Sequence, residues 1–315
     1  MYRNLKVICG SSHKEFSYAV ARSLGISVTE VETFRFSNEN FMVKIKENVR
    51  EADVFVVQTS CTPVSDGIME LFLMLDALRN SSAKRITAVI PYYPYVRSDK
   101  KDQPRISIAA RLMANLLETA GADRILTMDL HSPQIQGFFN FPSDQLFASN
   151  IICDYIKTLP DWKNFVIVAA DVGEAKHLGK FANILNLPMA IIDKRRIGNT
   201  DNIEPVYVIG DVKGKKALIL DDEVSTANTL CKAAIFLMEK GASSVSCAIV
   251  HPVLSGNAVK NINAAPIDEL IFTDTIPLGD KLKECEKKIT VLSVAALFAK
   301  SIERIHDGRS ISDLF

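Results

Sequence analysis

Two adjacent carboxylates, Asp221 and Asp222, stand between an apolar run and a short loop of small polar residues at 225–229. The apolar run 217–220 predicts a buried strand, and the apolar residues from Leu230 onward recur with helical spacing. A helix that begins after such a loop presents free N–H groups, which suit a phosphate. Carboxylates at the carboxyl end of a strand suit ribose hydroxyls, directly or through a metal ion. The stretch predicts a sugar-phosphate site, although the same residue types also form ordinary helix N-caps.

A charged, proline-interrupted stretch spans residues 91–105, with the sequence PYYPYVRSDKKDQPR. It is too polar for a core, and it predicts either a solvated surface loop or a mobile loop over an anion site. A second stretch, MDLHSPQIQGFF at 128–139, places His131 just past the carboxyl end of a predicted strand. A histidine there can bind a metal or a phosphate, although a lone histidine is more often a plain loop or core residue.

Charged residues also follow two strands predicted in the second half of the chain. The apolar run 165–170 leads to Asp171, and the run ending at Ile192 leads to the sequence DKRR at 193–196. Lysine supplies a mobile point charge and arginine a planar fork, and both suit phosphate groups. Clustered cations can also simply guard an edge strand. The pattern is compatible with phosphate chemistry without requiring it.

Strands and helices alternate along the chain, and one unit of this pattern occurs twice. Each copy has a strand, a polar loop, a helix and a second strand followed by proline: 54–57, 68–79 and 86–90, then 217–220, 229–240 and 245–250. Continuous apolar runs are typical of parallel strands buried on both faces. We therefore predict an α/β fold with two similar domains, 1–146 and 147–315, each a mainly parallel sheet flanked by helices. The sequence leaves open whether the final helix, 293–305, packs back on the first domain.

The composition is that of a packed globular protein and argues against several classes of function. Of 315 residues, 48% are hydrophobic and 23% charged, which suits two domains of about 150 residues each. Lys plus Arg and Asp plus Glu both number 37, so bulk electrostatics predict no nucleic-acid partner. No membrane span and no signal peptide are expected. The 6 cysteines include no CxxC pair, and we interpret them as reduced core thiols of a cytoplasmic protein.

The stretch DDEVSTANT at 221–229 resembles the phosphoribosyl-pyrophosphate loop of type I phosphoribosyltransferases. The stretches 91–105, 128–139 and 193–196 are similar to the flexible loop, the MDLH segment and the catalytic cations of ribose-phosphate pyrophosphokinases, in that family's order and spacing. The resemblance covers essentially the whole chain. It implies two tandem type I phosphoribosyltransferase-like domains.

The resemblance also implies a reaction and a set of roles. In this family, the diphosphate of Mg-ATP passes to the 1-hydroxyl of ribose 5-phosphate, giving AMP and 5-phospho-α-D-ribose 1-diphosphate for nucleotide biosynthesis. The implied catalytic residues are Lys194 and Arg196. The implied ATP-binding residues are Phe36, Asn38, Glu39, Asn40, Arg97, Ser98, Asp99, Lys100 and His131. The implied ribose 5-phosphate-binding residues are Asp171, Arg196, Asp221, Asp222, Ser225, Thr226, Ala227, Asn228 and Thr229. The implied ligands of Mg²⁺ are Asp129, His131 and Asp171, and the implied regulatory residues are Arg50, Gln136, Ser310 and Ser312.

Some residues depart from the family pattern and keep a second hypothesis open. Ser225 replaces a common Asp, Asn228 a usual Gly and Asn40 a usual Glu. If the glycine serves a positive φ, asparagine is the next most tolerant residue, and we expect this case at position 228. The departures favour a catalytically weak paralogue that acts as a regulatory subunit. The intact loop 91–105 and Lys194 favour the enzyme.

A third hypothesis is a phosphoribosyltransferase that uses a nucleobase. Such an enzyme would share the loop 221–229, but it would have no use for the loop 91–105 or for a duplicated domain. By family analogy we expect a homo-oligomer, a hexamer built from dimers. In that assembly, Phe36, Asn38 and Asn40 of a neighbouring subunit would hold the adenine.

Overall fold

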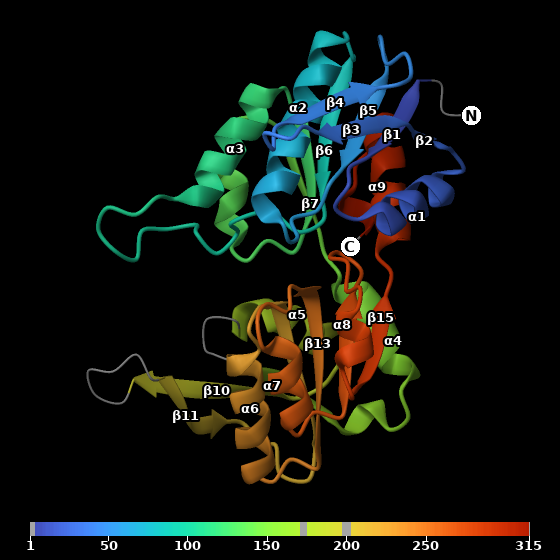
Figure 1. Cartoon of the computed structure of the whole chain (residues 1–315). Coiled ribbons are helices and arrows are strands. Elements are labelled where there is room, and N and C mark those ends of the chain that lie inside the picture. Colours follow the sequence, from blue (N-terminus) through green and yellow to red (C-terminus); the bar gives the residue numbers. More distant parts are fainter. Residues whose placement is uncertain (1–3, 171–174, 197–202, 315) are drawn as a thin grey trace. The chain divides into compact units, whose positions relative to one another are not determined.

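The computed structural model describes residues 4–170, 175–196 and 203–314, apart from the side chains at 175–177, 194–196 and 203–206. The chain divides into two compact units, each with a mainly parallel sheet and flanking helices (Figure 1). The first unit combines Met1–Phe147, Thr275–Pro277 and Ser293–Phe315, and the second combines Ala148–Asp274 and Leu278–Leu292. The predicted α/β fold class is confirmed.

A parallel six-stranded sheet forms the first unit, in the order β2-β1-β5-β6-β7-β8. Its strands are β1 (Leu5–Cys9), β2 (Val28–Thr29), β5 (Asp53–Val57), β6 (Arg85–Ile90), β7 (Arg124–Met128) and β8 (Ser143–Leu146). Its helical elements in the first half of the chain are α1 (Lys14–Leu24), α2 (Val64–Asn80), α3 (Ala109–Ala120) and the 3-10 helix η1 (Pro133–Phe138). Strand β5 is buried at every position, as its continuous apolar run predicted, because it lies inside the sheet.

The sequence of residues 28–36 is strand-like throughout, but the run contributes strands to two different sheets. Strand β2 joins the large sheet, whereas β3 (Val31–Arg35) pairs antiparallel with β4 (Phe41–Ile45) in a separate two-stranded sheet. β-branched and aromatic residues, which favour strands, occur on both sides of the change of sheet, so residue types alone could not reveal it. The hairpin β3–β4 carries the residues expected to bind adenine.

The last helix, α9 (Ala295–His306), packs on α1 in the first unit, where the two lie side by side (Figure 1). The buried rings of Phe16 and Phe298 meet edge to face, with centroids 5.4 Å apart. His306 Nδ1 lies 2.7 Å from Asp53 Oδ2 at the start of β5. A short 3-10 helix, η3 (Ser312–Leu314), follows α9. Segments from both ends of the chain therefore complete this unit.

A seven-stranded sheet forms the second unit, in the order β11-β10-β9-β12-β13-β14-β15. Only the pair β10–β11 is antiparallel among the strands that the structure describes there. The strands are β9 (Phe165–Ala169), β10 (Met189–Arg196), β11 (Ile203–Ile209), β12 (Lys216–Val224), β13 (Ser244–Pro252), β14 (Glu269–Thr273) and β15 (Lys288–Leu292). The helices are α4 (Ser149–Thr158), η2 (Trp162–Asn164), α5 (Ala175–Leu185), α6 (Asn228–Glu239), α7 (Ala258–Ala264) and α8 (Lys281–Glu284).

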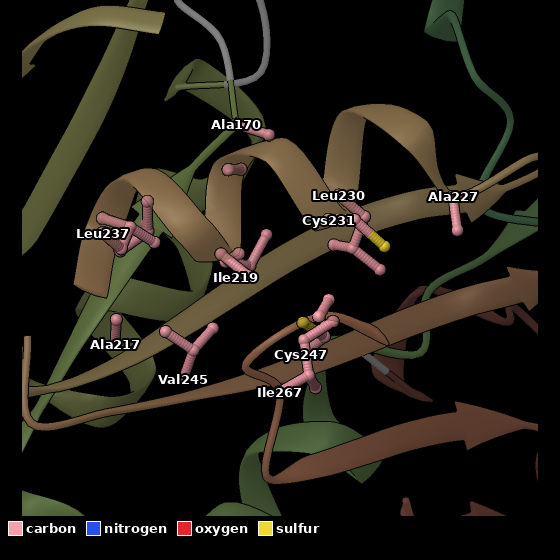
Figure 2. Packing of buried hydrophobic residues seen from close by; sticks show 14 of the residues in the cluster. Ala170, Ala217, Ile219, Ala227, Leu230, Cys231, Leu237, Val245, Cys247 and Ile267 are labelled. Carbon is pink, nitrogen blue, oxygen red and sulfur yellow. The ribbon is translucent and has the colours of Figure 1, made fainter. Parts of the chain in front are cut away.

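The core of the second unit lies between α6 and the strands β12 and β13. Figure 2 shows Ile219 and Cys247 on the strands and Leu230, Cys231 and Leu237 on α6. Burial raises the pKa of Cys231 to about 11 and that of Cys247 well above the usual value. Thiols in such a setting stay protonated and inert, in agreement with their interpretation as free core residues. Among the described residues, no helix is both long and apolar enough to cross a membrane.

Candidate active site

The loop at 225–229 links β12 to α6, as the sequence predicted. Its left-handed residue is Ala227, with φ 61° and ψ 4°, whereas Asn228 is the first residue of α6. The expectation that position 228 carries a positive φ is therefore wrong. The turn into the helix is made one residue earlier, where an L-residue is rarely found. Ala227 is held there because its methyl group is buried in the core beneath α6 (Figure 2).

Three consecutive carbonyl groups of this loop are held from one side by the segment that follows β13. Leu254 N donates to Val224 O at 3.0 Å, and Ser255 N donates to Ser225 O at 2.9 Å. Asn261 Nδ2 of α7 donates to Thr226 O at 3.0 Å. Because the N–H and C=O of a trans peptide point in opposite directions, the amides of residues 225–227 point away from this segment. Consecutive amides at a helix N-terminus form an anion-binding concavity.

The side chain of Asn228 is turned toward α7. Asn261 Nδ2 donates to its Oδ1 at 2.9 Å, in addition to the bond with Thr226 O. Asn261 was not among the predicted site residues. It lies on another helix and follows no recognisable motif, so nothing in the sequence marked it.

The acidic pair lies inside β12, which continues to Val224 instead of ending at Leu220. Successive side chains leave a strand on opposite faces, so Asp221 and Asp222 diverge. Ala217 and Ile219 pack in the core cluster with α6, and Asp221 shares their face of β12, which puts Asp221 on the α6 side. Asp222 Oδ1 accepts a hydrogen bond from Glu223 N at 2.9 Å. The two carboxylates thus occupy the two sides of the strand that leads to the loop.

The cationic stretch 193–196 forms the end of β10, which pairs antiparallel with β11. The register of this pair shifts between Asp193 and Lys194. Such bulges re-aim side chains and occur often next to active sites. The side chains of Lys194 and Arg196, and all of Asp171, lie outside the described residues.

In the first unit, the predicted adenine-binding residues form the turn of the hairpin β3–β4. Phe36 N donates to Asn40 O at 2.8 Å, and Glu39 N donates to Phe36 O at 2.9 Å. Asn38 Oδ1 accepts from Asn40 N at 3.2 Å. The ring of Phe36 is 44% exposed and lies edge-on to Phe34, with centroids 4.9 Å apart. The turn therefore presents an aromatic face and polar groups to its surroundings.

The charged stretch 91–105 has no helix or strand and lies between β6 and α3, where the chain extends outward (Figure 1). Its base is fixed: Tyr93 is buried and donates to Ala110 O at 2.9 Å. Ser98 also holds the base, because its Oγ donates to Ser107 O at 3.2 Å and its carbonyl accepts from Ala110 N. Arg97 and Lys100 are exposed, and Asp99 is half-buried. The stretch is thus held to the start of α3 by hydrogen bonds, and its charged residues can contact an anion when the loop folds over it.

Asp129 and His131 stand just past β7, as the sequence predicted. Asp129 has φ 33° and its N–H donates to Leu146 O of β8 at 3.0 Å. His131 is exposed. Within the described parts of the chain, no group of three or more His, Cys, Asp or Glu residues is placed to hold a metal ion. Asp129 and His131 thus offer a pair of ligands that would need further partners.

The residues expected to serve regulation all belong to the first unit. Arg50 is exposed, and Gln136 donates to Gln145 Oε1 at 2.7 Å. Near the end of the chain, Arg304 Nη1 donates to Ser310 O at 2.7 Å, and Ser312 N donates to Ser310 Oγ at 3.1 Å. The predicted site residues thus form two sets: the adenine, loop and histidine residues in the first unit, and the ribose and cationic residues in the second.

The chain has two α/β units with mainly parallel sheets, and one of them carries an acidic pair and an amide-lined loop. These features define the class of proteins that bind sugar phosphates. Residues 5–121 match the N-terminal domain of ribose phosphate pyrophosphokinase, and residues 197–315 match the phosphoribosyl synthetase-associated domain. The chain belongs to the ribose-phosphate pyrophosphokinase family.

Relatives of known name match nearly the whole chain. It is 46% identical to a ribose-phosphate pyrophosphokinase of Deinococcus radiodurans, over 99% of this chain and 98% of that protein. It is 44% identical to one of Helicobacter pylori strain J99, over 99% of this chain and 96% of that protein. The crystal structure of phosphoribosylpyrophosphate synthetase from Mycobacterium smegmatis is similar with a TM-score of 0.90 and 38% identity, over 97% of this chain and all of that one.

Proposed function

We propose that this chain transfers the diphosphate of Mg-ATP to the 1-hydroxyl of ribose 5-phosphate, giving 5-phospho-α-D-ribose 1-diphosphate and AMP. The observation that carries the proposal is the start of the loop 225–229, where hydrogen bonds to the carbonyls of residues 224–226 turn the amides of residues 225–227 to one side. The match to enzymes over 99% of the chain supports it. The hypothesis of a regulatory paralogue is not favoured, because the relatives that match nearly the whole chain are named as the enzyme.

In the ribose 5-phosphate site, the loop 225–229 would hold the 5-phosphate through its amides and the hydroxyls of Thr226 and Thr229. Asp221 and Asp222 would accept hydrogen bonds from the ribose hydroxyls, and Asp171 would assist. Ser225 in place of an Asp removes a negative charge near the phosphate and leaves a donor. These contacts fix the sugar so that its 1-hydroxyl can meet ATP.

In the ATP site, Phe36, Asn38, Glu39 and Asn40 of the hairpin would contact adenine. Arg97, Ser98, Asp99 and Lys100 of the loop and His131 would contact the nucleotide and its phosphates. The carboxylates among the expected ligands suit Mg²⁺, which is commonly held by one or two carboxylates, with substrate phosphates and water completing its shell. Asp129, His131 and Asp171 would hold the ion, which when bound neutralises charge on the phosphates.

In the reaction, the oxygen of the sugar 1-hydroxyl bonds to the β-phosphorus of ATP. The bond from that phosphorus to the oxygen bridging to the α-phosphate breaks, AMP leaves, and the hydroxyl proton is lost to solvent. Such transfer depends mainly on positioning and on stabilising charge. Lys194 and Arg196 would stabilise the charge on the transferred group.

We also propose a cytoplasmic homo-oligomer, a hexamer built from dimers, with regulation through Arg50, Gln136, Ser310 and Ser312. Free cysteines, half of them buried, suit a reducing compartment.

The decisive experiment measures AMP formed from Mg-ATP with and without ribose 5-phosphate. AMP and the diphosphate product should appear in equal amounts only when the sugar is present. Release of AMP independent of the sugar, or no AMP at all, would refute the proposed function.

Replacing Asn228 by glycine should change the KM for ribose 5-phosphate by less than about tenfold, or about 1.4 kcal/mol. Asn228 has helical backbone and its side chain is bonded to Asn261, so glycine removes one exposed hydrogen bond without changing the turn at Ala227. Steady-state kinetics with varied sugar would measure the change. An inactive wild-type protein that gains activity from Asn228→Gly would instead support the regulatory paralogue.

If the ATP site is completed by a neighbouring subunit, Phe36→Ala should raise the KM for ATP and leave the KM for ribose 5-phosphate unchanged. Oligomers that mix Phe36→Ala with Lys194→Ala chains should then regain part of the activity, because each chain supplies the half-site that the other lacks. Activity would be measured after co-refolding the two variants. Absence of recovery in oligomers shown to be mixed would indicate a site built within one chain.

A further inference from the structure

The hairpin β3–β4 depends on helix α2 for its position. It forms a sheet of its own, and its strands pair with each other rather than with the large sheet. Val31, Val43 and Ile45 are partly buried against the core cluster to which Leu71 and Leu75 of α2 belong. Apolar packing of this kind brings the hairpin to the helix, but it is not directional. Hydrogen bonds between the hairpin and α2 are directional, and they can fix the orientation of the hairpin on the helix.

A buried carboxylate on α2, that of Glu70, connects the hairpin to the body of the unit. Glu70 is only 3% exposed. Its Oε1 accepts from Thr33 Oγ1 of β3 at 2.8 Å. Its Oε2 accepts from Gln58 Nε2 at 2.8 Å, from Ser11 N at 3.2 Å and from Ser11 Oγ. One buried side chain thus joins β3 to the segments that follow β1 and β5 through four hydrogen bonds.

The body side of this network is itself held in place. Gln58 is 2% exposed, its Nε2 also donates to Gly67 O at 3.1 Å, and its Oε1 accepts from Ser12 N at 3.0 Å. A Cβ at Gly10 would lie 2.1 Å from Gln58 Oε1, so glycine is required there for Gln58 to reach Glu70. Glu70 is therefore fixed on the body side, and Thr33 is the contact through which it holds the hairpin.

The geometry of the two elements explains why this contact orients the turn. Residues 31, 33 and 35 share one face of β3, and positions 66 and 70 share one face of α2. Arg35 Nη1 pairs with Asp66 Oδ2 at 3.0 Å beside the Thr33–Glu70 bond. Arg35 is exposed and Asp66 is half-buried, so water screens this ion pair and it contributes little. The turn with Phe36 comes directly after these positions.

We propose that Glu70 is a positioning residue for nucleotide binding, acting through Thr33 on the hairpin that carries Phe36, Asn38 and Asn40. This rests on the proposed function, in which that turn contacts adenine. The hydroxyl of Thr33 fixes the hairpin against α2, and the orientation of Phe36 follows from it. Loss of that one bond should weaken binding of ATP without affecting the sugar site or the chemistry.

The test compares Thr33→Val, which is isosteric but cannot donate, with Thr33→Ser, which keeps the hydroxyl. The matched control is Thr119→Val on α3, whose hydroxyl donates to Asn115 O at 2.9 Å. Calorimetry would give the Kd for Mg-ATP, and hydrogen exchange would give the opening of amides in β3 and β4. Thr33→Val should raise that Kd about three- to tenfold and speed exchange in the hairpin by a similar factor. Thr33→Ser and Thr119→Val should stay within about twofold of wild type.

The inference is overturned if Thr33→Val leaves either the Kd for Mg-ATP or hairpin exchange unchanged. It is also overturned if kcat and the KM values for both substrates change alike, since that indicates a general loss of structure. Turnover of the wild type is measured separately. A wild type that binds ATP but makes no diphosphate product would refute the proposed function, while calorimetry and exchange would still decide the role of Thr33 and Glu70.

Discussion

Replacement of Lys194 by alanine should lower kcat by on the order of a hundredfold or more and leave both KM values much less affected. Lys194 follows the irregularity in β10, and its ammonium would contact the transferred diphosphate mainly in the transition state. An interaction made only in the transition state changes kcat and kcat/KM together. Initial rates of AMP formation at saturating substrates would measure the loss.

Lys213→Ala provides the control for Lys194, because Lys213 is also a lysine of the second unit and is exposed before β12. It should retain wild-type kcat. Lys194→Arg should recover little, since a planar guanidinium does not replace a compact ammonium. A Lys194→Ala enzyme with nearly normal kcat would remove Lys194 from the catalytic residues.

The second large effect concerns the acidic pair. Asp221→Asn and Asp222→Asn should each lower kcat/KM for ribose 5-phosphate by about tenfold to a hundredfold, because hydrogen bonds to charged groups contribute about 1.5–3 kcal/mol. The combined variant should lose on the order of a hundredfold or more. The KM for ATP should change far less, since the expected adenine contacts lie on the hairpin of the first unit.

Asp211→Asn makes the same chemical change at an exposed carboxylate of the second unit, where Asp211 Oδ1 accepts from Lys213 N at 3.1 Å. It should leave kcat/KM unchanged. Because Asp221 and Asp222 leave β12 on opposite faces, the two single variants should lose different amounts of kcat/KM for ribose 5-phosphate. Equal activity of the wild type and the combined variant would exclude the pair from the sugar site.

The buried strands and the amphipathic helices could be predicted from the sequence, because each depends on the spacing of apolar residues along one segment. The continuous apolar runs gave β5 and β12 correctly as buried strands, and the stripe after the loop gave α6. The change of sheet after Thr29 was missed, because residue types that favour strands occur on both sides of it. The start of α2 at Val64 was also missed, since Val64 follows a loop and comes directly after Pro63.

In the candidate site, too, features set by chain order could be predicted, whereas features set by tertiary contacts could not. The loop 225–229 and His131 were placed correctly beside strand ends, because chain order determines which strand precedes them. The turn at Ala227 was not foreseen, since it depends on packing of its methyl group under α6. Asn261, Glu70 and Thr33 were not foreseen either. Each acts through a partner far away in the sequence, and such contacts exist only after the chain has folded.

The packing of α9 on α1 has a consequence for how the protein is made and dissected. The first unit needs Ser293–Phe315, which are synthesised only after the segments of the second unit. Until then, Phe16 lacks the ring of Phe298, and Asp53 lacks His306. A fragment ending at Phe147 would therefore expose the apolar face of α1 and be prone to aggregate during expression. An autonomous version of this half would have to carry α9 as a graft, joined through a linker after Phe147.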